Sequence, residues 1–239
     1  MPMLYVNLPD DQTRRLSFYL AMEEFLLDEL NDDVLFVWKV EPSVIIGQNQ
    51  VLADEVNVDY CFKNNINIYR RKSGGGCVFS DLGNLMISRI YRTKDVERAF
   101  ADHLELLRLS LAGLGIQSVH SSNNDIMIAK HKVSGNAVQL TEKGCVVHGT
   151  LLFNSDMDMM INAITPSVDK LSKNGVQSVR QRVVNINSIS KCTEADFISI
   201  LKNNLSYNTY TLSEAQIIKV EALEKEYLSE SFIYSKLLL

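Results

Sequence analysis

Glycine, proline and cysteine are scarce in this sequence. Its 239 residues include 11 glycines, 4 prolines and 4 cysteines, whereas glycine and proline usually make up roughly 7% and 5% of a protein. This composition excludes a collagen-like chain and argues against a low-complexity or disordered one. The cysteines form no C-x-x-C pair and the four histidines form no H-x-x-x-H pair. Neither spacing therefore indicates a zinc site or a redox dithiol, and we interpret the thiols as reduced.

Long apolar runs and an excess of positive charge are also missing. The runs Phe18 to Met22 and Val34 to Trp38 are far shorter than the ~20 residues that span a bilayer. Charged residues between Asp10 and Arg15 interrupt the N-terminal region, so we expect no signal peptide. With 24 Lys plus Arg against 29 Asp plus Glu, the net charge is −5, which argues against a general nucleic-acid binder. We therefore expect a soluble, cytoplasmic protein that binds neither membranes nor nucleic acid.

The remaining composition is that of a globular protein, with 46% hydrophobic and 22% charged residues. Apolar residues that recur every three or four positions predict helices, and apolar runs bounded by turn residues predict strands. Apolar spacing predicts the helices Leu16–Leu30 and Val96–Leu114. Patterns that resemble capping boxes, Thr193/Asp196 and Ser213/Gln216, predict two more helices, at about Glu194–Leu205 and Glu214–Leu228. The predicted strands are Val34–Val40, Ser43–Ile46, Ile66–Arg71, Asn84–Tyr91, Gln117–His120, Asp125–Ala129, Lys132–Leu140 and Cys145–Asn154. No linker or internal repeat divides them, so we expect a single α+β domain over residues 1–239.

Three consecutive glycines, Gly74 to Gly76, follow the cations Arg70, Arg71 and Lys72 at the end of a predicted strand. Glycine allows a ligand to approach the backbone closely, and exposed N–H groups in such a turn bind anions. The P-loop pattern is absent, and Phe79 stands where the dinucleotide pattern G-x-G-x-x-G requires its last glycine. The segment predicts a phosphate or carboxylate site. The alternative is a flexible hairpin tip with incidental charges.

A second group of polar residues lies further along the chain: Asn124-Asp125, Lys132 to Ala137 and His148-Gly149-Thr150. Taken alone, a lysine is most often a solvated surface residue and a histidine a structural one. The pattern G-x-S-x-G is missing around Ser134, which disfavours a serine hydrolase. These residues become informative only together with the glycine segment.

The combined blocks resemble the lipoate-protein ligase A family. The strongest similarity lies in Arg70-Arg71-Lys72-Ser73-Gly74-Gly75-Gly76-Cys77-Val78-Phe79-Ser80-Asp81-Leu82-Gly83-Asn84-Leu85, in Asn124-Asp125, in Lys132-Val133-Ser134-Gly135-Asn136-Ala137 and in His148-Gly149-Thr150-Leu151-Leu152-Phe153-Asn154-Ser155-Asp156. Weaker similarity extends from about Ser17 through Val44-Ile45-Ile46-Gly47 to Ser178-Val179-Arg180-Gln181-Arg182-Val183. The resemblance covers most of the chain in one collinear order.

This resemblance implies the catalytic domain shared by lipoate ligases, octanoyltransferases and biotin ligases, an α+β fold with a mixed β-sheet and flanking helices. The implied activity is that of an ATP-dependent lipoate-protein ligase. Lipoate and ATP form lipoyl-AMP and pyrophosphate, and the lipoyl group then passes to a lysine of an acceptor domain. The implied acceptors are the glycine cleavage H protein and the acyltransferase subunits of 2-oxoacid dehydrogenases. ATP with Mg²⁺ and lipoate are the expected cofactor and substrate.

The resemblance also assigns roles to residues. Lys132 is the implied catalytic residue, beside the acyl carbonyl and the α-phosphate, and Asp125 is the implied Mg²⁺ ligand. Residues implied to bind substrate or nucleotide are Arg71, Ser73, Gly74, Gly75, Gly76, Val78, Phe79, Asn84, Asp125, Ser134, Gly135, His148, Gly149 and Thr150. We expect Val78, Val44 and Ile46 to contact the dithiolane and alkyl tail. Arg180 and Arg182 are open to two interpretations, binding of phosphate or acceptor and solvated surface.

Several alternatives stay open. The chain stops at Leu239, so we expect it to lack the C-terminal accessory domain of many family members, which a separate protein can supply. It could then transfer lipoyl or octanoyl groups only from preformed lipoyl-AMP. A route through an enzyme thioester is disfavoured because Ser121 to Asn123 occupy the place of the reactive cysteine in one group of octanoyltransferases, although Cys77 and Cys145 remain possible. A non-catalytic protein that binds lipoate or lipoyl-AMP is the last alternative.

Overall fold

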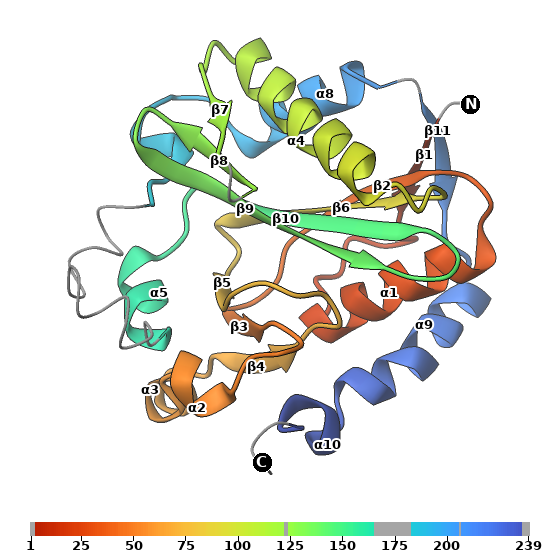
Figure 1. The fold of residues 1–239 in the computed structure, drawn as a ribbon, viewed down its shortest axis with the longest axis vertical. Coiled ribbons are helices and arrows are strands. Elements are labelled where there is room, and N and C mark those ends of the chain that lie inside the picture. Colours follow the sequence, from red (N-terminus) through yellow and green to blue (C-terminus); the bar gives the residue numbers. More distant parts are fainter. Residues whose placement is uncertain (1–2, 122–123, 165–182, 206, 236–239) are drawn as a thin grey trace.

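An eight-stranded mixed sheet forms the centre of the fold (Figure 1). The computed structural model describes residues 3–121, 124–164, 183–205 and 207–235. The strand order in the sheet is β11 (Tyr207–Thr211), β1 (Met3–Asn7), β2 (Val34–Trp38), β6 (Asn84–Tyr91), β10 (Cys145–Leu152), β9 (His131–Leu140), β8 (Asp125–Ile128) and β7 (Val119–His120). Strands β11, β1 and β2 run parallel to one another, and every later pair is antiparallel.

Helices cover both faces of this sheet (Figure 1). On one face lie α4 (Val96–Gly113) and α8 (Glu194–Asn203), and on the other lie α1 (Leu16–Glu29) and α9 (Glu214–Tyr227). Successive strand residues alternate between the two cores, because side chains of a strand point to opposite faces. Phe36 packs under α1, whereas its neighbour Leu35 packs under α4. None of the helices in the described part of the chain is long and apolar enough to cross a membrane.

A smaller three-stranded sheet lies beside α1 and carries short helices of its own (Figure 1). Its strand order is β4 (Asn67–Arg70), β3 (Ser43–Ile46) and β5 (Val78–Ser80). The short helices are α2 (Leu52–Glu55), α3 (Val58–Lys63), α5 (Met157–Ala163) and α10 (Glu230–Ile233), and a 3-10 turn spans Ile186–Ser188. The connection from β4 to β5, residues 71–77, contains the three glycines and is called the glycine-rich loop below.

The four predicted helices begin at the residues where the structure begins them, and the expected mixed sheet with flanking helices is confirmed. The capping boxes Thr193/Asp196 and Ser213/Gln216 both form. Three short strands, β1, β5 and β11, were not predicted from the sequence. They have only three to five residues, and β1 and β11 are supported by pairing with each other across some 200 positions of sequence. Arg180 and Arg182 lie outside the described residues.

Gly83, in the turn between β5 and β6, makes a close backbone contact with the segment that follows β10. Its carbonyl accepts hydrogen bonds from the N–H groups of Phe153 and Asn154, at 3.1 and 2.8 Å. A Cβ atom on Gly83 would lie 2.1 Å from the carbonyl oxygen of Asn154. Backbone on both sides leaves no side chain to move away, so only glycine fits here.

We expect Gly83→Ala to lower the free energy of unfolding by about 1–3 kcal/mol, the usual cost of forcing extra atoms into a packed site. Urea denaturation followed by circular dichroism measures this change. Gly76→Ala is the matched control, because a Cβ there meets no atom within 4 Å, and its unfolding midpoint should equal that of the wild type. Equal midpoints for both variants would contradict the close contact.

Candidate active site

A cavity of about 270 Å³ opens between the glycine-rich loop and strands β9 and β10. Both sheets contribute to its wall, since Ile45 and Val78 belong to the small sheet and Ala137 and His148 to the large one. One part of the wall is apolar and consists of Leu20, Trp38, Ile45, Val78 and Met86. The opposite part is polar and includes Arg71, Asp125, Lys132, Asn136, His148 and Thr150. The cavity therefore suits a ligand with an apolar tail and a charged head.

Two of the three residues expected to contact the tail of the ligand, Val44 and Ile46, do not line the cavity. Ile45 lines the cavity, whereas Val44 and Ile46 are fully buried in the core of the small sheet. All four residues of β3 are buried, so the apolar run gave no alternation by which to assign its faces. Val78 lines the cavity as expected.

Arg71 shapes the glycine-rich loop from within. Its Nη2 donates hydrogen bonds to the carbonyl oxygens of Gly74 and Gly76, at 2.6 and 2.8 Å. Its Nε donates to Ser73 Oγ at 2.9 Å and its Nη1 to the Ile45 carbonyl oxygen at 3.3 Å. Burial lowers the pKa of Arg71 to about 10, so the guanidinium stays protonated at neutral pH. Arg71 lines the cavity, but most of its donors are engaged by the protein itself.

These bonds also orient the amide groups of the loop. In a trans peptide the C=O and the following N–H point in opposite directions, and the described chain contains no cis bond. With the carbonyls of Gly74 and Gly76 turned toward Arg71, the N–H groups of Gly75 and Cys77 point away from it. Among the described residues none accepts from either N–H. Both residues line the cavity, which makes this backbone a candidate anion site.

Gly75 is the position where the loop needs glycine most clearly. Its φ of +94° lies in the left-handed region, and a Cβ there would lie 2.9 Å from Arg71 Nη2. A side chain would therefore disturb both the backbone and the guanidinium. By contrast, Gly74 and Gly76 have open space where a Cβ would stand.

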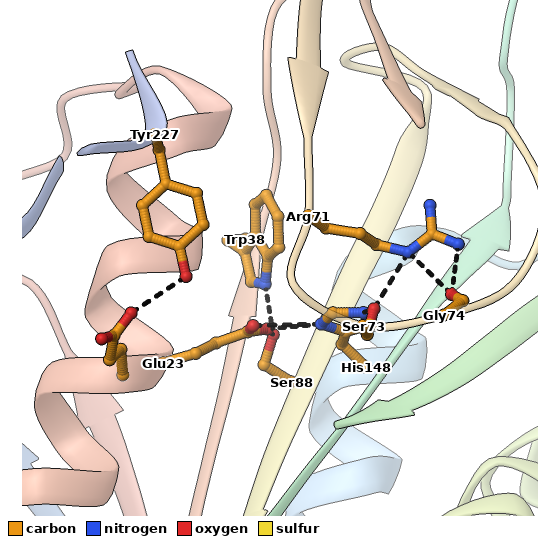
Figure 2. Close-up of polar contacts among 9 residues, drawn as sticks. Glu23, Trp38, Arg71, Ser73, Gly74, Ser88, His148 and Tyr227 are labelled. Atoms are coloured by element: carbon orange, nitrogen blue, oxygen red, sulfur yellow. Dashed lines mark hydrogen bonds and ion pairs between the residues drawn. The ribbon is translucent and has the colours of Figure 1, made fainter. Parts of the chain in front are cut away.

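A chain of hydrogen bonds continues from Arg71 into the protein (Figure 2). Ser73 Oγ lies 2.7 Å from His148 Nε2, and His148 Nδ1 lies 3.0 Å from both carboxylate oxygens of Glu23. Ser88 Oγ donates to Glu23 at 2.5 Å and accepts from Trp38 Nε1 at 2.8 Å. The network links α1, β2, β6 and β10 to the glycine-rich loop.

The cations on either side of Arg71 anchor the loop to helices. Arg70 is buried, and its Nε donates to the carbonyl oxygen of Ile233 in α10 at 2.9 Å. Lys72 Nζ lies 2.9 Å from both Glu24 of α1 and Glu226 of α9. It also lies 5.0 Å from the centre of the Tyr227 ring, whose hydroxyl donates to Glu24. Only Arg71, the middle cation, faces the cavity.

Lys132 and Asp125 form an ion pair on the cavity wall, with Nζ 2.8 Å from Oδ1. Strands β9 and β8 bring them together across a register shift at Ile126/Met127. The Lys132 side chain is 37% exposed, so its ammonium remains accessible to a ligand or a second protein. Lys132 packs over Gly135, where a Cβ would lie 2.7 Å from Nζ.

Asn136 lies in β9, and its side-chain amide makes hydrogen bonds to two other segments of the protein. Its Nδ2 donates to the Asn124 carbonyl oxygen at 2.9 Å, and its Oδ1 lies 3.1 Å from His103 Nε2. Burial lowers the pKa of His103 to about 3, so this histidine is neutral. A neutral imidazole that donates through Nε2 fixes the orientation of the Asn136 amide.

The residues assigned from the resemblance divide into two groups. Those that line the cavity are Arg71, Gly75, Gly76, Val78, Asp125, Lys132, Gly135, His148, Gly149 and Thr150. Five others stand behind this wall. Ser73 contacts Arg71 and His148, and Gly74 accepts from Arg71. Phe79 belongs to the small-sheet core, Asn84 Nδ2 donates to the Phe79 carbonyl oxygen, and Ser134 is buried beside Asn136.

No group of three or more His, Cys, Asp or Glu side chains within the described part of the chain could hold a metal ion by itself. Asp125, the expected Mg²⁺ ligand, is engaged with Lys132. Its second carboxylate oxygen leaves room for a metal that arrives with its own ligands, as Mg²⁺ does with the phosphates of a nucleotide. The residues present therefore fit Mg²⁺ carried by a nucleotide, with a single protein ligand.

Sequence reasoning assigned no role to Glu23, Ser88 or Trp38. Glu23 had a detectable signal, because it continues the spacing of Leu16, Leu20 and Leu27 on the buried side of α1. A carboxylate at such a position is rarely buried without a partner. Ser88 and Trp38 belong to apolar strands and become visible as site residues only through their partners in space.

Comparison with known proteins finds relatives among the lipoate-protein ligases. Lipoate-protein ligase LplJ of Bacillus subtilis (strain 168) is 34% identical over 237 residues, covering 94% of this chain and 71% of the relative. Lipoate-protein ligase 1 of Staphylococcus aureus (strain Mu50) is 39% identical over 172 residues, covering 70% of this chain and 52% of the relative. The chain thus spans about half the length of the second relative.

A solved structure has the same fold. It is described as a bi-partite lipoate protein ligase and its E2 lipoyl domain from Thermoplasma acidophilum, and it superposes with a TM-score of 0.85 at 24% identity. The match covers 98% of this chain and 96% of that one. A family model described as the lipoyl protein ligase A/B catalytic domain matches residues 16–206. Because that match includes most of the chain, the protein belongs to the lipoyl protein ligase A/B catalytic-domain family.

Proposed function

We propose that this chain activates lipoate with ATP to lipoyl-AMP and transfers the lipoyl group to a lysine of an acceptor domain. The observation that carries the proposal is a single cavity with an apolar wall at one side and, at the other, loop N–H groups and the Lys132–Asp125 pair. Membership of the family supports the same reaction.

The shape of the cavity supports an acid of modest size. Its volume of about 270 Å³ lies just below the roughly 300–1,000 Å³ of common ligand clefts. The alkyl chain and dithiolane of lipoate would pack against Trp38, Ile45 and Val78. The carboxylate would then lie at the polar end, next to the glycine-rich loop.

In the first half-reaction a carboxylate oxygen of lipoate attacks the α-phosphorus of ATP, and pyrophosphate leaves. Negative charge develops on the α-phosphate, where the N–H groups of Gly75 and Cys77 and the ammonium of Lys132 can stabilise it. In the second half-reaction the amine of the acceptor lysine attacks the acyl carbonyl, and AMP leaves. Lys132 serves both steps, and Asp125 keeps its ammonium directed into the cavity. Mg²⁺ held by Asp125 and the phosphates would neutralise charge on the nucleotide.

The proposed acceptors are the glycine cleavage H protein and the acyltransferase subunits of 2-oxoacid dehydrogenases, in the cytoplasm. The partly exposed Lys132 supports access for an acceptor lysine. We propose further that a separate accessory protein can assist the activation step, because the neighbour from Thermoplasma acidophilum that shares this fold is described as a bi-partite lipoate protein ligase.

A second candidate is a transferase that uses preformed lipoyl-AMP and makes none itself. A third candidate binds lipoate or lipoyl-AMP without catalysis. The three differ in which half-reaction the purified protein performs.

Replacement of Lys132 by Ala should reduce both half-reactions by a factor on the order of 10² or more, because it removes the charge that stabilises both transition states. Lipoate-dependent exchange of labelled pyrophosphate into ATP measures activation. Transfer from synthetic lipoyl-AMP to a purified lipoyl domain measures the second step. Lys130→Ala is the matched control, since Lys130 is an exposed residue of the preceding turn, and it should keep wild-type rates.

The outcomes separate the candidates. Exchange and transfer by the wild type support the ligase, whereas transfer without exchange assigns the transferase. Binding of lipoyl-AMP with neither reaction, even after addition of an accessory protein, assigns the binding protein. An active Lys132→Ala variant with an intact fold would overturn the role of that lysine.

Cys77 bears on the thioester alternative because it lines the cavity. Burial raises the pKa of its thiol to about 12 from its usual value near 9, so the reactive thiolate is scarce at neutral pH. Cys145 is buried in the core beneath α4, away from the cavity. The reaction proposed here needs no enzyme nucleophile.

We expect alkylation of Cys77 by iodoacetamide to keep rising up to about pH 12, since the thiolate fraction grows until the pH passes the raised pKa. Peptide mass spectrometry measures the rate, with the denatured chain as the reference that levels off near pH 9. We also expect Cys77→Ala to keep its transfer rate within a few-fold. A plateau near pH 9 in the folded protein, or a hydroxylamine-labile lipoyl adduct on Cys77, would contradict this view.

A further inference from the structure

Glu23 is a buried carboxylate with no Lys or Arg partner among the described residues. It lies in the middle of α1, is 4% exposed, and receives hydrogen bonds from Ser88 Oγ and His148 Nδ1 only. Burying a carboxylate is costly unless the hydrogen bonds it accepts compensate for lost water. The hydrogen bonds of Glu23 show which other residues of the site its position affects.

The hydrogen bonds that start at Glu23 have a defined direction. A carboxylate only accepts, so His148 Nδ1 must carry the proton that faces it. In a neutral imidazole Nε2 then accepts, and Ser73 Oγ is its donor at 2.7 Å. The lone pairs of that hydroxyl remain available to Arg71 Nε at 2.9 Å. Donation therefore runs one way, from Arg71 through Ser73 and His148 to Glu23 (Figure 2).

At its other end this row of hydrogen bonds reaches the glycine-rich loop, the candidate anion site. Arg71 holds the carbonyls of Gly74 and Gly76, which fixes the two following N–H groups on Gly75 and Cys77, both of which line the cavity. The two ends also carry opposite charges. Burial lowers the pKa of Arg71, and the negative charge of Glu23 opposes that shift. The hydrogen bonds through His148 and Ser73 connect these two charged groups.

A branch from the same carboxylate reaches the apolar wall. Ser88 Oγ donates to Glu23 and accepts from Trp38 Nε1, and Trp38 lines the cavity. The Trp38 ring is held on its other side by stacking on Tyr19, with centroids 4.6 Å apart. Glu23 is therefore the junction between the polar and apolar parts of the wall.

We propose that Glu23 is a positioning residue for acid activation: through His148 and Ser73 it fixes Arg71 and the N–H groups of the glycine-rich loop, and through Ser88 it fixes Trp38. Glu23 is absent from the residues that line the cavity, so it acts only through these neighbours. The inference rests on the proposed function for its kinetic consequence, but its structural consequence can be measured independently.

The decisive variant is Glu23→Gln, which keeps the size of the side chain and adds an N–H donor. That donor favours the other tautomer of His148, in which Nε2 carries the proton and no longer accepts from Ser73. Glu23→Asp is the conservative variant, because a carboxylate again accepts from Nδ1. Glu29→Gln makes the same chemical change at an exposed position of the same helix and serves as the control.

Four measurements are made on the full chain. Nitrogen-15 NMR of the imidazoles reports the tautomer of His148, assigned by comparison with His148→Gln. Calorimetry reports binding of ATP and of lipoate separately. Pyrophosphate exchange reports KM and kcat, and urea unfolding shows whether each variant is folded.

For Glu23→Gln we expect the Nε2-protonated tautomer, weaker binding of both ligands, and kcat/KM lowered on the order of 10²-fold, the scale of a misplaced catalytic contact. Glu23→Asp should restore the Nδ1-protonated tautomer and part of the rate, and Glu29→Gln should match the wild type. A folded Glu23→Gln protein with wild-type tautomer, binding and kinetics would overturn the proposal, as would an altered tautomer with unchanged binding.

Failure of the proposed function gives a different result. A wild-type protein without exchange or transfer would reject the ligase, whereas the tautomer and the binding of ATP and lipoate would still decide the role of Glu23. Loss of stability alone, with binding unchanged in the folded variant, would assign Glu23 a structural role and reject positioning.

Discussion

The conformation of the site depends on the hydrogen bonds that the buried guanidinium of Arg71 donates to the backbone. Glycine residues give the loop the freedom to pass close to a ligand, but that freedom also lets the loop adopt many conformations. Arg71 removes it by binding the carbonyls of Gly74 and Gly76 and the carbonyl of Ile45 in the small sheet. The loop is consequently held in one conformation, with Gly75, Gly76 and Cys77 on the cavity wall.

The two sheets and their helices support this arrangement from several directions. Arg70 ties the end of β4 to α10, and Lys72 ties the loop to α1 and α9. Glu23 reaches the same loop from α1 through His148 in β10. Because each contact comes from a different element, the loop is held only when the whole domain is folded. This dependence explains why helices remote from the ligand belong to the functional unit.

Much of the fold and part of the site could be predicted from local sequence. Helices α1 and α4 were predicted from apolar spacing and helices α8 and α9 from their capping boxes, and both signals are properties of neighbouring residues. Arg71, Lys132 and His148 were predicted as site residues because they stand in motifs that resemble those of the family. The residue of β3 that lines the cavity was assigned wrongly, because a fully buried strand shows no alternation of apolar and polar residues. Strands β1 and β11 were not predicted, because each is supported by pairing with the other.

The sequence by itself predicted an α+β fold and a glycine segment suited to an anion, because these follow from composition, periodicity and the chemistry of adjacent residues, while the lysine motif followed from the family resemblance. The tertiary structure alone decided that Ser73 is not part of the cavity wall, that Ile45 lines the cavity, and that Glu23 and Trp38 belong to the same network. The physical reason is that hydrogen-bond direction and side-chain orientation depend on partners far apart in the chain. Glu23 and His148 are 125 positions apart, yet lie within hydrogen-bonding distance.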